Sequence, residues 1–247
     1  KITAAIELLK CITLTKDEFN KIENLIPTQN GIFNISAREI IPFSKEYLFT
    51  YKIPAKYNPN AKAERWLQFL EEVTSGDKEL QCVIQEYFAY CLIPENIHEK
   101  ALFLYGRGRN GKSVCLNMLL YLLGKENVSH ISFNDLSTAF ERARLQNKLV
   151  NISTEITDRG LNSTKYFKEI VSGETVEICY KFQNPFATQL RIKLVYACNS
   201  MPRISDKSEG ILERILIIPF NAKFKGDKCD KNLSKKLQKE IDGIFLW

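Results

Sequence analysis

One short segment, GRGRNGKS at residues 106–113, constrains this chain more than any other. It has the spacing G-x-x-x-x-G-K-[ST], in which glycines let backbone N–H groups face phosphate oxygens, Lys112 supplies positive charge and the Ser113 hydroxyl can ligate Mg²⁺. Residues 102–105 before it predict a buried strand, and residues 114–123 after it predict a helix with leucines at helical spacing. A phosphate would therefore lie at a helix N-terminus. The residues predicted to hold a nucleotide are Gly106, Gly108, Asn110, Gly111, Lys112, Ser113 and Val114.

Composition narrows the class of protein. The 247 residues allow one or two domains, and 45% hydrophobic with 26% charged residues is typical of a soluble globular chain. The net charge of +6 permits a polyanionic partner without requiring one. No apolar run approaches the roughly 18 residues of a membrane span, so we expect no membrane partner and a cytoplasmic location. Because the chain begins without Met and stops at Trp247 within a helical pattern, we expect a fragment truncated at its C-terminus.

The cysteines and histidines argue against a metal or disulfide scaffold. The seven cysteines are odd in number and form no C-x-x-C pair, which is typical of core thiols in a reducing compartment. With only two histidines, a histidine-based metal cluster is excluded. The single metal that the sequence predicts is therefore the Mg²⁺ that accompanies a nucleotide.

Residues 1–95 predict a small, mainly helical N-terminal domain with short extended segments. Residues 1–26 have apolar spacing typical of a helix, and residues 61–73 and 77–92 predict two further helices. Between them, the Asn30-Gly31 turn signal and three prolines divide the chain into short extended pieces.

Residues 96–247 predict an α/β domain. Predicted strands at 101–105, 149–153, 191–198 and 214–218 alternate with predicted helices at 112–123, 162–172 and from 231 onward. Such alternation indicates a parallel sheet with helices on its faces. Ligands of these sheets bind beyond the carboxyl ends of the strands, so polar residues that follow strands are candidates for the site.

Two of these strands are followed by polar residues. Glu155 follows the strand at 149–153, where a carboxylate could bind Mg²⁺ or orient the attacking water, and Asp158 could share that role. Asn199 follows the strand at 191–198, and its amide could hydrogen-bond the γ-phosphate or the water. A solvated loop acid and a simple turn are the alternative interpretations.

Cations outside the glycine segment offer two further functions. Arg214 precedes the strand at 214–218 and could reach a phosphate on a neighbouring subunit, with Arg203 as the competitor. Extended residues 175–182 lead into a turn, which predicts a hairpin carrying Lys181 and Phe182 near its tip. A cation beside an aromatic ring suits backbone contact and base stacking on single-stranded nucleic acid.

Taken in order, these segments resemble the superfamily 3 helicase module of phage and plasmid primase–helicases, akin to the poxvirus-type primase ATPases. The resemblance implies an AAA+-like P-loop NTPase core, ATP and Mg²⁺ as cofactors, and a ring, usually a hexamer, that moves 3′ to 5′ on single-stranded or forked DNA. It also implies a bacterial or virus-infected host cell, with any primase domain outside these residues. In this scheme Lys112, Glu155, Asn199 and Arg214 are catalytic, Ser113 and Glu155 hold Mg²⁺, and Lys181 with Phe182 contacts DNA.

Two positions depart from that family pattern. Many members carry two acidic residues at the second motif, whereas Glu155 is followed by Ile156 here. Many also carry two arginines before the last strand, whereas Glu213 precedes Arg214 here. The division of work between Glu155 and Asp158, and between Arg214 and Arg203, therefore stays open.

The sequence favours an ATP-dependent replicative DNA helicase over two alternatives. The first alternative is a nucleotide-dependent DNA-binding or assembly ATPase that does not unwind DNA. The second is a P-loop phosphotransferase that acts on a small molecule and is indifferent to DNA.

Overall fold

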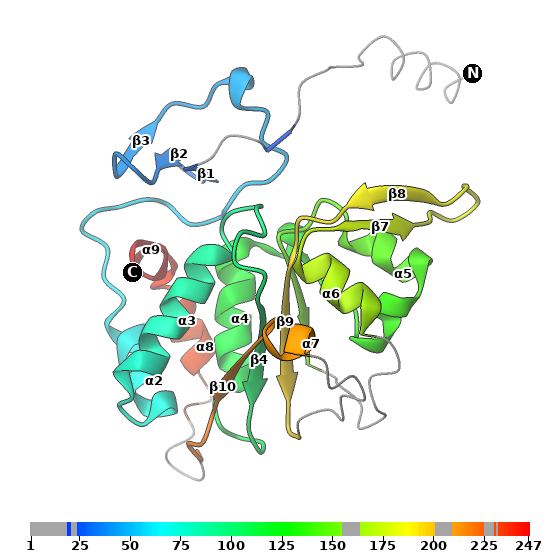
Figure 1. Cartoon of the computed structure of the whole chain (residues 1–247). Coiled ribbons are helices and arrows are strands. Elements are labelled where there is room, and N and C mark those ends of the chain that lie inside the picture. Colours follow the sequence, from blue (N-terminus) through cyan, green and yellow to red (C-terminus); the bar gives the residue numbers. More distant parts are fainter. Residues whose placement is uncertain (1–18, 21–23, 155–163, 201–208, 225–229, 231) are drawn as a thin grey trace.

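A parallel sheet of five strands forms the centre of the structure (Figure 1). The computed structural model describes residues 19–20, 24–154, 164–200, 209–224, 230 and 232–247. The strands lie in the order β10-β4-β9-β6-β5, and each neighbouring pair is parallel. Their bounds are β4 Ala101–Tyr105, β5 Val128–Ser129, β6 Val150–Ser153, β9 Lys193–Cys198 and β10 Ile215–Pro219. The predicted α/β class and parallel sheet are confirmed.

Two apolar layers cover the two faces of this sheet. Successive side chains of a strand point to opposite faces, so Leu102 and Leu104 of β4 join one cluster while Ala101 and Phe103 join the other. Helices α2, α3, α4, α8 and α9 contribute to the first cluster, and α6 and α7 contribute to the second. The helix bounds are α2 Glu64–Thr74, α3 Lys78–Tyr90, α4 Lys112–Leu123, α5 Ala139–Arg142, α6 Lys165–Val171, α7 Glu209–Leu212, α8 Leu233–Gln238 and α9 Ile241–Leu246. Short 3₁₀ turns at Lys125–Asn127, Asn134–Ser137 and Ala143–Leu145 link them.

Most predicted elements around the sheet are confirmed. Strand β4 and helix α4 begin and end at the predicted residues, 101–105 and 112–123. Helices α2 and α3 correspond to the predicted helices at 61–73 and 77–92, and Asp77 caps α3 by accepting from the Leu80 amide at 3.1 Å. Strand β5 was not predicted, because two residues are too short to produce a recognisable pattern.

Ahead of α2, a three-stranded antiparallel sheet lies at the upper left of Figure 1, above the layer of helices that contains α3 and α9. Its strands are β1 Leu25–Thr28, β2 Gly31–Asn34 and β3 Glu39–Ile41, followed by a 3₁₀ turn at Lys45–Tyr47. The predicted turn at Asn30-Gly31 joins β1 to β2. The helix predicted for 1–26 is wrong at Leu25 and Ile26, because pairing with β2 overrides their helical spacing; residues 1–18 and 21–23 of that prediction lie outside the described residues.

The apolar cluster on the α4 face extends across residue 95, where the sequence placed a domain boundary. Trp66 and Phe69 of α2 lie in the same cluster as Leu119 of α4 and Leu237 of α8. The Glu240 carboxylate, between α8 and α9, accepts from the Arg65 amide at 3.1 Å and the Trp66 amide at 2.9 Å. It thus satisfies two of the N–H groups that the start of a helix leaves unpaired.

A β-hairpin projects from the other side of the sheet (Figure 1). Its strands, β7 Thr175–Ile178 and β8 Phe186–Gln189, are antiparallel. The buried Arg142 of α5 anchors it: Nε and Nη2 donate to the Glu177 carbonyl at 2.9 and 2.6 Å, and Nη1 donates to the Leu136 carbonyl at 2.8 Å. The predicted hairpin is therefore present, and its base is fixed to the helical layer beneath it.

Candidate functional site

The carboxyl ends of three neighbouring strands meet at one cleft. Strand β9 lies between β4 and β6, so the glycine segment after β4, Thr154 after β6 and Asn199 after β9 reach the same edge of the sheet. The cleft has a volume of about 720 Å³. Its lining residues are Arg65, Phe69, Glu72, Gly108, Arg109, Asn110, Gly111, Lys112, Ser113, Val114, Thr154, Ala197, Asn199, Phe224, Asp230 and Leu233.

The Lys112 ammonium lies at the centre of this edge. It is 7% exposed and donates to the Gly106 carbonyl, to Asn110 Oδ1 at 3.2 Å and to Asn199 Oδ1 at 3.2 Å. All three acceptors are neutral, and no carboxylate of the described residues forms an ion pair with it. Burial lowers the pKa of Lys112 below its ordinary value. An anion that neutralised this charge would therefore be stabilised here.

Asn110 fixes the start of the glycine segment. Its side chain is buried, with Nδ2 donating to the Phe220 carbonyl at 2.9 Å and Oδ1 accepting from Lys112. The space between them leaves no room for a side chain at Gly106, where a Cβ would lie 2.2 Å from Asn110 Nδ2 and 2.3 Å from the Phe220 carbonyl oxygen. Gly106 is thus required by the packing of β10 against the loop.

Gly111 and Gly108 serve different purposes. Gly111 has φ of 94°, and a Cβ there would lie 2.6 Å from Val73 Cγ1 of α2, so both conformation and space require glycine. At Gly108 a Cβ would meet no atom within 4 Å. The structure therefore gives no packing reason for Gly108, whereas its position on the cleft suits close approach of a ligand to the backbone.

The first turn of α4 offers backbone donors to the cleft. Gly111 is the N-cap and provides no side-chain cap, while the exposed Ser113 and the half-buried Val114 line the cleft. The unpaired N–H groups and the positive end of the helix dipole favour an anion at this point. All the predicted nucleotide-holding residues except Gly106 thus line the cleft at this helix start.

The far end of the cleft was not predicted from the sequence. Helix α2 contributes Phe69 and an ion pair between Arg65 Nη2 and Glu72 Oε2, 3.2 Å apart. The carboxy-terminal part contributes Phe224 and Asp230, the latter 2.7 Å from Lys236. No local motif marks these residues, because they meet only when α2 and α8 pack together.

The two predicted hairpin residues do not line this cleft. Lys181 and Phe182 occupy the turn between β7 and β8, with the Lys181 ammonium 5.1 Å from the centre of the Phe182 ring. Phe182 is 94% exposed and has φ of 64°, an uncommon conformation for a large side chain. The side chain therefore contributes little to packing within its own chain.

Arg214 makes contacts within its own chain. It directly precedes β10, and its carbonyl accepts from the Ala101 amide at the amino end of the sheet. Its guanidinium donates to Ser172 Oγ at 2.9 Å and to the Gly210 carbonyl at 2.6 Å, and it lies 3.4 Å from Glu99 Oε2. Glu155, Asp158 and Arg203 lie outside the described residues, although Thr154, which precedes Glu155, lines the cleft.

Two kinds of feature are absent from the described residues. No helix there is long and apolar enough to cross a bilayer. No group of three or more histidine, cysteine or acidic side chains gathers in the described part of the chain to hold a metal ion.

Comparisons with known proteins relate the chain to viral proteins that are named as helicases. A family of unknown function, DUF5906, matches residues 104–214, and the family described as D5 N terminal like matches residues 1–75. The protein named "Putative helicase L207/L206" of Acanthamoeba polyphaga mimivirus is 26% identical over 86% of this chain and 23% of its own length. The "Putative helicase 121R" of Invertebrate iridescent virus 3 is 24% identical over 57% of this chain and 16% of its own length.

Solved structures share the fold. Two apo structures of the NrS-1 C terminal region, at 14% and 15% identity, cover 98% of this chain with TM-scores of 0.66 and 0.67. The chain corresponds to 59% and 58% of those two structures, and to less than a quarter of each viral relative. The D5 N terminal like match and the two viral relatives support a relationship to the D5-type primase–helicase family.

Proposed function

We propose that this chain is the ATPase module of a superfamily 3 DNA helicase of the AAA+ class. The observation that carries the proposal is the Lys112 ammonium, which lies at the start of α4 among neutral oxygens only. A buried cation of this kind, beside unpaired N–H groups, suits the β- and γ-phosphates of a nucleotide. The helicase-named viral relatives add support for the class of enzyme.

The cleft accounts for both ends of ATP. The triphosphate would lie along Gly108–Ser113, and the nucleoside would extend toward Phe69 of α2 and Phe224. Ser113 and Glu155 would hold Mg²⁺, which would neutralise charge on the phosphates. In this arrangement the base contacts Phe69, which lies before the predicted domain boundary at residue 95, and Phe224, which lies after it.

The remaining residues have roles around the γ-phosphate. Glu155 orients the attacking water, and Asn199, already in contact with Lys112, hydrogen-bonds the water or the phosphate. Arg214 of a neighbouring subunit offsets charge that develops in the transition state. To reach it, the guanidinium must exchange its contacts with Ser172 and Glu99 for the phosphate.

DNA would be held by the hairpin. Lys181 suits a backbone phosphate and the exposed Phe182 ring suits a base. Subunits would form a ring, usually a hexamer, around the strand.

The test is steady-state ATP hydrolysis with and without single-stranded DNA, followed by unwinding of a forked duplex. We expect DNA to stimulate hydrolysis and Lys112→Ala to abolish it, whereas Lys62→Ala, which removes an exposed lysine, leaves both rates unchanged. Hydrolysis that DNA does not affect, in a protein that mass measurement shows to be oligomeric, would count against a helicase and favour a phosphotransferase. DNA-stimulated hydrolysis without unwinding would favour a DNA-binding ATPase.

A further inference from the structure

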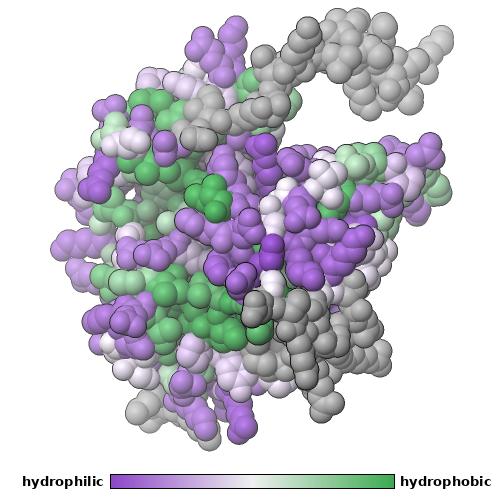
Figure 2. Space-filling view, viewed as in Figure 1, coloured by the Kyte–Doolittle hydropathy of each residue, from purple (hydrophilic) through white to green (hydrophobic). Residues whose placement is uncertain are grey.

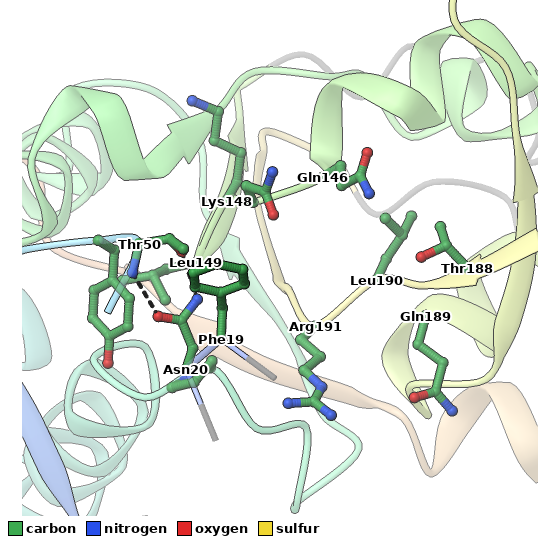
Figure 3. A pocket seen from close by; sticks show the side chains of 13 residues that line it. Phe19, Asn20, Thr50, Gln146, Lys148, Leu149, Thr188, Gln189, Leu190 and Arg191 are labelled. Atoms are coloured by element: carbon green, nitrogen blue, oxygen red, sulfur yellow. Dashed lines mark hydrogen bonds between the residues drawn. The ribbon is translucent and has the colours of Figure 1, made fainter. Parts of the chain in front are cut away.

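A second cleft lies at the opposite edge of the sheet, at the amino ends of β6 and β9 (Figure 3). It has a volume of about 390 Å³. Three separate segments line it: Phe19, Asn20, Thr50 and Tyr51 from the amino-terminal part, residues 146–149 before β6, and residues 188–191 between β8 and β9, together with Pro94. None of these residues takes part in the nucleotide site proposed above.

The walls of this cleft are fixed. The Asn20 side chain accepts from the Thr50 amide at 2.8 Å and donates to Thr50 Oγ1 at 2.6 Å, so the first segment is bound to the chain that leads toward α2. On the opposite wall, the Tyr180 hydroxyl donates to Gln146, which links the hairpin to the turn before β6. Figure 3 shows Asn20 and Thr50 on one side, Thr188 and Gln189 on the other, and Arg191 between them.

The described side chains that line the cleft include cations but no carboxylates. No Asp or Glu lines the cleft, although acidic residues are frequent in the chain, and both of its ionisable cations, Lys148 and Arg191, lack an ion pair with any described carboxylate. Lys148 Nζ donates to the Glu126 carbonyl, a neutral group. Such a cleft favours an anionic ligand.

The neutral side chains narrow the class of anion. Three amide side chains, those of Gln146, Asn147 and Gln189, can offer donors and acceptors, as the edge of a nucleobase requires, whereas the Asn20 amide is bonded to Thr50. Phe19 is 51% exposed and supplies an aromatic face. Cations, amides and an exposed aromatic ring together suit a nucleotide of an unpaired strand, whose phosphate, base edge and base face can each find a partner here. An inorganic anion or an acidic peptide would use only the cations and the amides.

The cleft is continuous with the hairpin. Thr188 and Gln189 are the last residues of β8, and the other end of that strand leads to Lys181 and Phe182. Gln189 and Arg191 also line an adjoining cleft of about 420 Å³ beside Ser172 and Gly173. One surface thus runs from the hairpin turn to the amino-terminal part of the chain, and Figure 2 shows that the exposed face between them is mostly hydrophilic.

We propose that this cleft is a second contact site for single-stranded nucleic acid. Arg191 holds a backbone phosphate, and Phe19 stacks on a base whose edge meets the amides of Gln146 and Gln189. A strand seated here is held away from the ATP cleft, at the other end of the sheet. The site binds without nucleotide hydrolysis, so its test does not depend on the function proposed above.

The experiment measures binding of a fluorescent oligothymidylate of about 15 nucleotides, a length within the range of known single-strand sites. Anisotropy is recorded without ATP over a series of salt concentrations. We expect Arg191→Ala to lower the slope of log affinity against log salt by about 0.7, the value for one lost phosphate contact on a single strand. Arg191→Lys should retain the slope, and Phe19→Ala should weaken binding about fivefold or more.

Controls separate this site from the hairpin and from misfolding. Lys62→Ala removes an equal charge from the exposed segment before α2 and should leave the slope unchanged. Melting temperatures establish that each variant is folded, and Phe19, half exposed, provides a second probe if Arg191→Ala unfolds. The inference is overturned if folded Arg191→Ala and Phe19→Ala variants bind as the wild type does while Lys181→Ala binds more weakly.

Discussion

The Lys112 ammonium donates to the side-chain oxygen of Asn199 across 3.2 Å, although 87 residues separate them in the sequence. The contact exists because β9, which ends before Asn199, lies directly beside β4, which leads to Lys112. It joins the residue that would bind phosphate to the residue that would sense it.

Substitutions of Asn199 should separate binding from hydrolysis. Asn199→Ala removes a polar group near the reacting phosphate, so we expect ATP turnover to fall about 100-fold. Asn199→Asp places a carboxylate against the Lys112 ammonium, raises the pKa of Lys112 and competes with phosphate, so we expect nucleotide affinity to fall about tenfold. Titration with a fluorescent ATP analogue measures the affinity. Equal affinity in the wild type and Asn199→Asp would show that the two side chains separate when nucleotide binds.

Substitution by alanine should destabilise the protein at one glycine of this loop and have little effect on stability at another. Gly106→Ala forces a methyl group against Asn110 and the Phe220 carbonyl, so we expect the free energy of unfolding to fall by about 1–3 kcal/mol. Gly108→Ala meets no neighbour, so its free energy of unfolding should stay within about 0.5 kcal/mol of the wild type. Urea denaturation of both variants gives the comparison. Loss of stability in Gly108→Ala alone would contradict this account of the loop.

A mixing experiment should decide whether Arg214 acts on a neighbouring subunit. Lys112→Ala and Arg214→Ala subunits are each expected to be inactive alone. If Arg214 acts across an interface, a mixed assembly contains sites with an intact Lys112 that face an intact Arg214, so hydrolysis returns. If Arg214 acts only within its own chain, every site in the mixture lacks one residue. Ser172→Ala, which removes a partner of the guanidinium but keeps the arginine, is the matched control.

Lys193 should give folding stability a distinct pH dependence. It is 2% exposed at the start of β9, donates to the Ile93 carbonyl and lies 4.7 Å from the centre of the Tyr90 ring. Burial lowers its pKa from 10.5 to about 8. Between these two values the unfolded chain binds more protons than the folded chain, so this group makes folding more favourable as pH rises.

The measurement compares the wild type with Lys193→Met across that window. We expect the free energy of unfolding of the wild type, relative to Lys193→Met, to increase from about pH 8 toward 10.5 by on the order of 3 kcal/mol. The comparison cancels the titration of groups that Lys193 does not affect; Cys91, whose pKa the Lys193 charge lowers, has a pKa of about 12 and lies above this window. A constant difference across the window would show that Lys193 has an ordinary pKa in the folded state.

A substitution in the hairpin turn should weaken DNA binding and leave the stability of the protein unchanged. Phe182 is almost fully exposed, so Phe182→Ala removes few contacts and the melting temperature should not move measurably. Affinity for oligothymidylate should fall about fivefold or more through the lost stacking. Phe167→Ala, which truncates a fully buried ring of α6, should instead lower the melting temperature strongly. Unchanged DNA affinity in Phe182→Ala would show that the hairpin does not hold the strand.

The sequence predicted the parts of this molecule whose causes are local. Gly111 and Lys112 are fixed by the geometry that a helix start needs, and β4 and α4 have strong apolar patterns, so their bounds were predicted correctly. Leu25 and Ile26 were assigned to a helix because their spacing allowed it, whereas pairing with Phe33 and Asn34 places them in a strand. The spacing of apolar residues within one segment does not show which other strand will pair with that segment.

Contacts between residues that are far apart in the sequence could not be predicted from local patterns. Arg65 and Asp230 line one end of the cleft beside Lys112 although they lie far apart in the chain, and nothing near either residue in the sequence indicates a ligand. The cleft beside Arg191 likewise depends on three segments that meet only in the folded chain. The sequence could name the residues that we propose to hold phosphate, because their pattern is contiguous, but it could not name the residues that form the other walls of the cleft.

The Glu240 carboxylate that caps α2 has a consequence for how motion could be observed. Because it holds the Arg65 and Trp66 amides, these two hydrogens should exchange slowly with solvent only while the carboxy-terminal helices remain seated on α2. Arg65 also lines the cleft beside Lys112. The rate of amide exchange at these two adjacent positions would therefore report any separation of the carboxy-terminal helices from this wall of the cleft.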